Sequence, residues 1–432
     1  MSTNKVAERL SWLVALIIAL IPFHAFLTVW FSSVLGHYTA IRLWKEYLLL
    51  ALVLGSSYLL YKDRKLRKSF FSSRLSLLII VYSLVSLVWG VGAYALDKVT
   101  LKALGYGLIV NLRFLVFFLA VWLIASLAPK LKQLWPKLLF IPAGIAIFIG
   151  LLQRLAVPYD VLKHFGYSES TIYPYETINH NINYPRVMST LRGANPLGAY
   201  LVVVLTGFCC FFTKFRDRWL RAFLVAGGFV VLFLSYSRGA WIGMALSLAT
   251  LGILKLKNNR PKKLLVLTIA GLLMITPSVA LRHTSTFQNY VFHTEDRSSI
   301  AESSNEGHVS AFRNGVHDLV HAPLGRGVGT AGPASLYNHD KVRISENYYI
   351  QLAQEIGWLG LALFLAINFL VAKELWLRRN DTLAMALFAS FVGLIFVNLV
   401  SHAWTDDTLA YLWWGLAGIA LAPILKHKHH HE

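Results

Sequence analysis

The sequence predicts an all-α polytopic membrane protein with about 12 transmembrane helices. Of its 432 residues, 56% are hydrophobic and only 14% are charged, and the mean hydropathy is +0.56. Soluble globular domains carry about a quarter charged residues, so this composition excludes an ordinary soluble enzyme. Apolar stretches of roughly 17–25 residues, long enough to cross a bilayer as helices, recur along the whole chain.

These apolar stretches define the expected helices. They lie near residues 10–30, 42–61, 75–94, 104–128, 138–156, 196–213, 221–236, 239–254, 264–281, 347–372, 383–401 and 409–425. The first is longer than the core of a signal peptide and is not followed by a small-residue cleavage site, so we expect it to remain as a helix. The sequence shows no internal repeat and no separate soluble domain, and residues 1–432 are expected to form one membrane domain.

The basic residues predict the orientation in the membrane. Lys and Arg number 41 against 21 Asp and Glu, which gives a formal net charge of +20. Clusters follow every second expected helix, on the side of both chain ends, at residues 62–68, 130–137, 214–221, 255–263 and 373–379. Because basic loops face the cytoplasm, we expect both termini there. Topology explains the charge, and no nucleic-acid partner is expected.

Two long connections are expected on the opposite, extracytoplasmic side, at residues 157–195 and 282–346. Loops longer than about 15 residues are usually functional or disordered. Both segments are rich in Pro, Gly, His, Arg and aromatic residues, which favours function. The sequence therefore predicts an active site on the outer face.

The first polar motif of this face precedes the helix expected from residue 196. Arg186 and Arg192 come just before Asn195 and Pro196, which suit a helix start with Asn as N-cap. Two arginines before a helix N-terminus form an anion site, since the free N–H groups add to their charge. The alternative is a pair that contacts lipid headgroups.

The second motif is Ser235-Tyr236-Ser237-Arg238-Gly239-Ala240-Trp241, between two closely spaced apolar runs. Arg238 is therefore expected at or inside the membrane boundary. An ionisable residue at this depth is costly and indicates a functional site by default. A structural ion pair is the alternative.

The third motif is a predicted amphipathic helix lying on the membrane after residue 307. Arg313, His317 and His321 recur four residues apart, opposite an apolar stripe. A glycine-rich segment, Gly325–Gly329, follows and is expected to form a tight turn, since it does not match a phosphate-binding loop. His308, His317 and His321 lack the intervening Glu of a zincin motif, and no metal site is expected.

Several carboxylates lie at or near the starts of the last expected helices. Glu346 precedes Asn347 at the start of one helix, and we consider it as a helix cap or as a general base. Glu355, two turns further along, is expected to pair with another group inside the membrane. Asp406 and Asp407, in the link between the last two helices, fit either a supporting role at the site or a solvated turn.

Four of these segments resemble the O-antigen ligase and polymerase superfamily, in the same order. Glu346-Asn347, nine residues and Gly357-Trp358-Leu359-Gly360 resemble its His-Asn, nine residues, Gly-x-x-Gly pattern. Ser237-Arg238-Gly239 resembles its Ser-Arg-Gly element. The segment from Pro185-Arg186 to Asn195 and the turn from Pro323 to Gly329 resemble two further elements. The resemblance spans about residues 180–360.

The resemblance implies a glycosyltransferase of the bacterial inner membrane. Such enzymes transfer a glycan from undecaprenyl pyrophosphate to a glycan or lipid A–core acceptor on the outer leaflet. It implies that Arg186, Arg192, Arg238 and Arg313 bind the pyrophosphate, and that Arg238 and Glu346 are catalytic in one inverting displacement. Supporting contacts are expected from Asn347, His308, His317, His339, Asp406 and Asp407. The lipid donor carries its own leaving group, so no metal or other cofactor is expected.

The sequence departs from the family in two places. Glu346 stands where ligases have His, and the family's loop arginine falls on His308, with Arg313 as the nearest substitute. The missing His favours a polymerase over a ligase, and a protein O-oligosaccharyltransferase is a third version of the same chemistry. A lipid or glycan carrier is the alternative outside enzymes, but carriers place polar groups near the midplane rather than at one surface.

Overall fold

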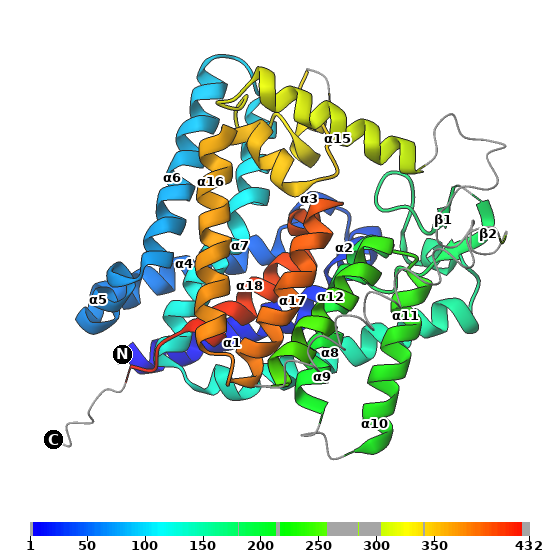
Figure 1. The fold of residues 1–432 in the computed structure, drawn as a ribbon, viewed down its shortest axis with the longest axis horizontal. Helices are drawn as coiled ribbons and strands as arrows, with labels where there is room; N and C mark the ends of the chain where they lie inside the picture. The colour runs from blue at the N-terminus through cyan, green and yellow to red at the C-terminus, as the bar shows by residue number, and fades with distance from the viewer. Residues whose placement is uncertain are drawn as a thin grey trace.

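The computed structural model is mostly helical (Figure 1). It describes residues 3–179, 181–212, 217–256, 284, 304–339 and 342–425, and the side chains of 304–308 are not among the described ones. The expected helix at 264–281 and the C-terminal Lys426 and Lys428 lie outside the described residues.

Residues 3–155 form eight helices. They are α1 (Thr3–Leu20), α2 (His24–Leu35), α3 (Tyr38–Arg42), α4 (Trp44–Lys62), α5 (Arg64–Ser72), α6 (Arg74–Ala95), α7 (Leu101–Leu127) and α8 (Lys130–Leu155). The chain continues with α9 (Ala194–Phe211), α10 (Arg218–Ala222), α11 (Gly228–Leu234), α12 (Arg238–Lys255), α15 (Ser304–His321), α16 (Tyr348–Leu377), α17 (Thr382–Leu399) and α18 (Asp407–Leu421). Short single turns connect them: η1 (Ile21–Phe23), η2 (Val161–Phe165), η4 (Phe223–Gly227), η6 (Gly332–Tyr337) and η7 (Ala403–Thr405).

Within the described part, seven helical segments are long and apolar enough to cross a membrane. They are Thr3–Leu35, α6, α7, α8, α9, α16 and α17. This establishes a polytopic, mainly α-helical membrane protein. The remaining expected stretches that the structure describes coincide with α4, with the interrupted α10–η4–α11 segment, with α12 and with α18. The count of 12 spans and the cytoplasmic termini stay predictions.

One segment expected as an irregular loop contains a small β-hairpin. β1 (Glu176–Ile178) pairs antiparallel with β2 (Asn181–Arg186), with Glu176 opposite Arg186. Asn179 turns the chain with a left-handed backbone (φ 48°), a conformation that Asn tolerates better than most residues. The hairpin thus presents Arg186 and Glu176 side by side, which a purely helical interpretation did not anticipate.

The helix α16 is kinked at Gly357. This kink accounts for both the Gly357–Gly360 motif and the glycine-rich segment 323–329, because the two lie against each other. Gly357 has φ 69°, and a Cβ there would lie 2.4 Å from the backbone carbon of Leu324. The kink exposes the carbonyl groups of Gln354 and Glu355, which accept hydrogen bonds from the N–H groups of Arg326 and Gly327, both at 2.8 Å. The segment 323–329 is therefore held against α16 by its backbone.

A buried carboxylate completes this contact. Glu355 accepts hydrogen bonds from Asn111 Nδ2 of α7 at 2.5 Å and from the Gly329 N–H at 2.8 Å. The expected pairing of Glu355 is confirmed, and its partners are an amide and a backbone donor. Because Gly327 and Gly329 N–H groups are bonded inside the protein, the glycine segment acts as a turn rather than as a phosphate cradle.

α15 lies beside the end of α16 at which that helix begins, whereas α5 lies toward its other end (Figure 1). It packs on α16 through Leu319, Ile350 and Ala353. Its apolar residues Val309, Phe312, Val316 and Val320 are exposed, as expected for a helix that lies on a membrane surface.

Candidate active site

A cavity of about 250 Å³ lies where the starts of α9, α16 and α18 meet. It brings together three residues that the sequence analysis selected in separate segments, Arg192, Glu346 and Asp406. Glu176 of the hairpin and His402 of the link between α17 and α18 also line it. Three carboxylates, an arginine and a histidine from distant segments therefore line one small cavity.

Arg186 joins the first two sequence motifs beside this cavity. Its Nε donates to the carbonyl of Ser235 at 2.9 Å, and its Nη2 donates to Asn195 Oδ1 at 2.7 Å. Its Nη1 lies 3.4 Å from Glu176 Oε2. Burial lowers the pKa of Arg186, and the charge of Glu176 opposes this effect.

Arg238 is the first residue of α12, and its charge interacts with that of Arg186. Two like charges held close together attract an anion, since a bound anion removes their repulsion. The guanidinium groups of Arg186 and Arg238 are therefore the candidates for an anion-binding part of the site.

The start of α9 differs from the expected one. Gly193, with an extended backbone, precedes the helix, and Asn195 lies in its first turn rather than at the cap. The Asn195 side chain instead accepts the hydrogen bond from Arg186. The Ala194 N–H donates to Glu176 Oε2 at 3.3 Å, so a carboxylate already occupies this helix N-terminus. The position suits an anion, as expected, but Glu176 was not foreseen.

Glu346 has a left-handed backbone, with φ 52°. Ser189 and Tyr236, in the other two segments around the site, have φ values of 55° and 50°. Such conformations cost energy for residues other than glycine and gather at functional sites. Of the three, Glu346 lines the cavity, and the other two lie within three residues of Arg192 and Arg238, so the backbone around the candidate site is constrained.

Asn347, not Glu346, caps α16. Its Oδ1 accepts from the Ile350 N–H at 3.0 Å, and its Nδ2 donates to the carbonyl of Leu399 at 2.8 Å. The Tyr348 N–H donates to the carbonyl of Ser401 at 3.2 Å. The cap alternative for Glu346 is therefore wrong, and these bonds bring the 399–406 link, with His402 and Asp406, to the side of Glu346.

Two comparisons with known proteins bear on this arrangement. Residues 222–365 match the family model described as O-antigen ligase. An O-antigen polymerase of Salmonella muenchen is 25% identical over 304 residues, which cover 67% of this chain and 72% of that protein. Both matches support the resemblance to the O-antigen ligase and polymerase superfamily that the sequence motifs indicate. Together with the apolar helices, this similarity supports an enzyme and indicates a multi-pass protein of the bacterial inner membrane.

The region that matches the family model contains only part of the candidate site. It includes Arg238, α15, Glu346 and the kink at Gly357, but Arg186, Arg192, His402 and Asp406 lie outside residues 222–365. His402 was missed in the sequence because only the two aspartates of the polar run Ser401–Asp407 were considered. The sequence does contain an indication of this role, because His402 lies between two apolar stretches on the side expected to carry the site.

Asp407 belongs to a buried ionic cluster below the cavity. It pairs with Arg113 of α7, with Lys45 Nζ at 3.2 Å and with His24 Nε2 at 3.0 Å, and Lys45 also pairs with Glu46 at 3.0 Å. The solvated-turn alternative is wrong for Asp407. The cluster ties α2, α4 and α7 to the start of α18, and so fixes the adjacent Asp406.

Asp406 caps α18 by accepting from the Leu409 N–H at 3.1 Å. Burial raises the pKa of this carboxyl to about 6, and the charge of Asp407 adds to the effect. Arg192 and Arg113 act in the opposite direction. Asp406 therefore exchanges a proton close to neutral pH, on the wall of the cavity.

The raised pKa predicts a pH dependence of stability. The folded protein holds the proton of Asp406 more tightly than the unfolded chain does. The protonated carboxyl therefore makes its full contribution to the free energy of unfolding below pH 3.8, and this contribution is lost as pH rises through about 6. Asp406→Asn, which retains a capping side chain, should gain stability over wild type between pH 4 and pH 7, by up to about 3 kcal/mol. Thermal unfolding in detergent at several pH values measures this difference.

Asp217→Asn is the matched control, because Asp217 caps α10 in the same way but is exposed. It should not reproduce the gain. A stability difference between wild type and Asp406→Asn that stays constant with pH would contradict the assignment.

The remaining candidates are not brought to the cavity. Arg313, His317 and His339 are exposed and are not among the described residues that line it. The rings of His317 and His321 stack at 4.0 Å on the surface of α15. The side chain of His308 lies outside the described residues. Among the described residues, no group of three His, Cys, Asp or Glu side chains is placed to hold a metal ion.

Proposed function

We propose that the protein is a glycosyltransferase that transfers a glycan from undecaprenyl pyrophosphate to an acceptor hydroxyl on the extracytoplasmic face. The similarity to the O-antigen ligase and polymerase superfamily supports the class of enzyme. The observation that carries the proposal is the cavity itself. Glu346 and Arg192 both line it, and the Arg186–Arg238 pair lies beside it.

The chemistry follows from these groups. The acceptor oxygen attacks the anomeric carbon of the donor sugar, and the bond from that carbon to the pyrophosphate oxygen breaks with inversion. Glu346 accepts the proton of the hydroxyl. Arg186, Arg192 and Arg238 stabilise the negative charge that develops on the leaving pyrophosphate. No metal or other cofactor is part of this proposal.

Among the acceptors, we favour a growing lipid-linked glycan, which makes the protein a polymerase. Two observations support this choice: Glu346 replaces the His of ligases, and the Salmonella relative is named an O-antigen polymerase. Transfer to lipid A–core or to a protein hydroxyl uses the same donor and the same cationic groups. The carrier alternative does not explain a strained carboxylate beside an anion site.

Purified protein with undecaprenyl-pyrophosphate oligosaccharide tests the proposal. A ladder of lengthening lipid-linked chains from the donor alone is the expected result. Product only after addition of lipid A–core would replace polymerase by ligase. Bound donor without product, under both conditions and with a protein acceptor, would contradict the enzyme proposal and favour a carrier.

A further inference from the structure

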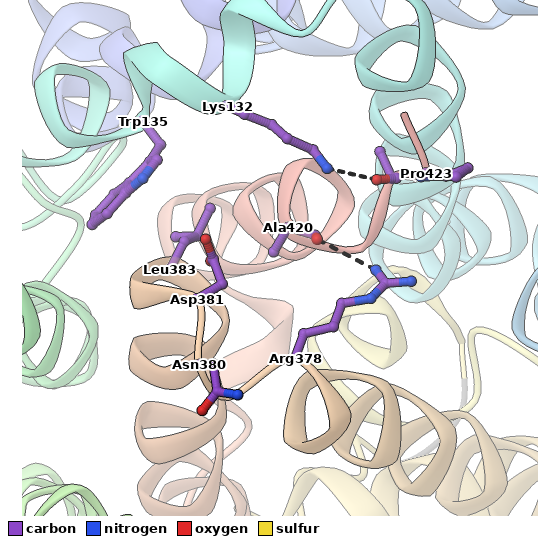
Figure 2. A pocket seen from close by; sticks show the side chains of 9 residues that line it. Lys132, Trp135, Arg378, Asn380, Asp381, Leu383, Ala420 and Pro423 are labelled. Carbon is purple, nitrogen blue, oxygen red and sulfur yellow. Dashed lines mark hydrogen bonds between the residues drawn. The ribbon is translucent and has the colours of Figure 1, made fainter. Parts of the chain in front are cut away.

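A second cavity, of about 430 Å³, lies at the opposite end of α17 and α18 from the active-site cavity. Its wall includes Asp381 and Leu383 at the start of α17 and Ala420 and Ala422 at the end of α18 (Figure 2). The 18 residues of α17 span about 27 Å. The two cavities therefore face opposite sides of the bilayer.

Two cations from different helices reach this cavity. Lys132 Nζ, from the start of α8, donates to the carbonyl of Ala422 at 2.7 Å, and Arg378 Nη1, after α16, donates to that of Ala420 at 3.3 Å (Figure 2). Both bonds cap the end of α18. An ammonium has three donors and a guanidinium five, so each cation retains N–H groups for a ligand in the cavity.

A neighbouring cavity of about 520 Å³ shares Arg378 and Pro423 with the first. It adds Arg74 and Lys373, and the hydroxyl-bearing residues Ser69, Ser72 and Ser73 line it as well. The two cavities together hold four basic residues against two acidic ones, Glu374 and Asp381. Trp122 and Trp135 contribute the aromatic rings that favour the membrane interface.

We propose that these two joined cavities bind the headgroup of an anionic phospholipid of the leaflet opposite the active site. Basic pockets between transmembrane helices hold such headgroups. One phosphate contacts Lys132 and Arg378, and a second contacts Arg74 and Lys373. Cardiolipin, which carries two phosphates, fills both cavities, and phosphatidylglycerol fills one. The bound lipid joins the ends of α6, α8, α16 and α18.

Thermal unfolding of the delipidated protein in detergent, with each lipid added, tests the proposal. Cardiolipin should raise the wild-type melting temperature more than phosphatidylglycerol, and phosphatidylethanolamine should raise it least. Arg378→Gln and Lys132→Gln should each weaken cardiolipin binding about fivefold, as expected for one lost cation. The readout is the increase over each variant's own lipid-free value, so a loss of the α18 cap does not obscure it.

Arg379→Gln and Lys130→Gln are the matched controls. Arg379 is exposed and lies over the Trp376 ring at 4.6 Å, and exposed Lys130 pairs with Glu8. Both should keep wild-type binding. Equal losses in the cavity variants and their controls, no loss in any variant, or equal stabilisation by phosphatidylethanolamine would overturn the proposal. So would inorganic pyrophosphate alone giving the cardiolipin effect, because the ligand would then be a soluble anion.

Discussion

Glu346→Gln is expected to reduce transfer by about 10²–10⁴-fold while donor binding stays close to wild type. A positioned general base contributes this range to the rate, and the amide of Gln cannot accept the proton. The substitution keeps the size of the side chain, and Asn347 rather than Glu346 caps α16, so the helix start should remain intact. Rates of glycan transfer and donor affinity, measured on the same preparation, check the two parts separately.

Two further variants sharpen this test. Glu346→His introduces the group that the superfamily pattern carries at this position and should restore part of the activity, with a changed pH profile. Glu169→Gln alters an exposed carboxylate of the 157–195 connection that does not line the cavity and should leave transfer unchanged. Wild-type rates in Glu346→Gln would exclude the general-base role and leave Glu346 as a strained residue that shapes the cavity.

Arg238→Ala is expected to lose both donor binding and transfer. A hydrogen bond to a charged group contributes about 1.5–3 kcal/mol, so donor affinity should fall by roughly 10- to 100-fold. Transfer should fall further, because the same guanidinium stabilises charge on the leaving group. Titration of undecaprenyl-pyrophosphate oligosaccharide and single-turnover transfer measure the two effects.

Arg218→Ala is the control for this variant. Arg218 lies on α10, before Arg238 in the chain. It is exposed, and its guanidinium lies 5.3 Å from the centre of the Trp219 ring. Its loss should change neither donor affinity nor the rate of transfer. Arg238→Lys keeps the charge without the planar fork and should give an intermediate result. Full donor binding in Arg238→Ala would remove Arg238 from the pyrophosphate site and leave that role to Arg186 and Arg192.

The candidate site was only partly predictable, and the differences follow from what a sequence pattern contains. Arg186, Arg192, Arg238 and Glu346 were found because each charge stands beside a long apolar run, where its cost is evident. The bonds from Arg186 to Ser235 and Asn195 were not predictable, since nothing in the spacing indicates which helix ends meet.

For other residues, the neighbouring sequence does not indicate the three-dimensional surroundings of the side chain. Arg313 has the sequence position of a substitute for the family's loop arginine, yet the structure exposes it on α15, away from the described lining of the cavity. Glu176 and His402 have no distinguishing neighbours in the sequence, and they become site residues only through the hairpin and the 399–406 link. The sequence around Asp407 is typical of a turn, but in the structure cations of α4 and α7 and a histidine of α2 contact it.

The amino-acid sequence alone indicates a helical membrane protein that resembles a known superfamily. Both properties are local, because hydrophobic length and short motifs depend on neighbouring residues. Three further properties follow only from the three-dimensional packing: which charges share the cavity, which carboxylates are buried in ionic contacts, and how the kink at Gly357 holds the 323–329 turn. Those outcomes depend on packing between helices hundreds of residues apart, where burial makes each polar group find a partner that the linear order does not specify.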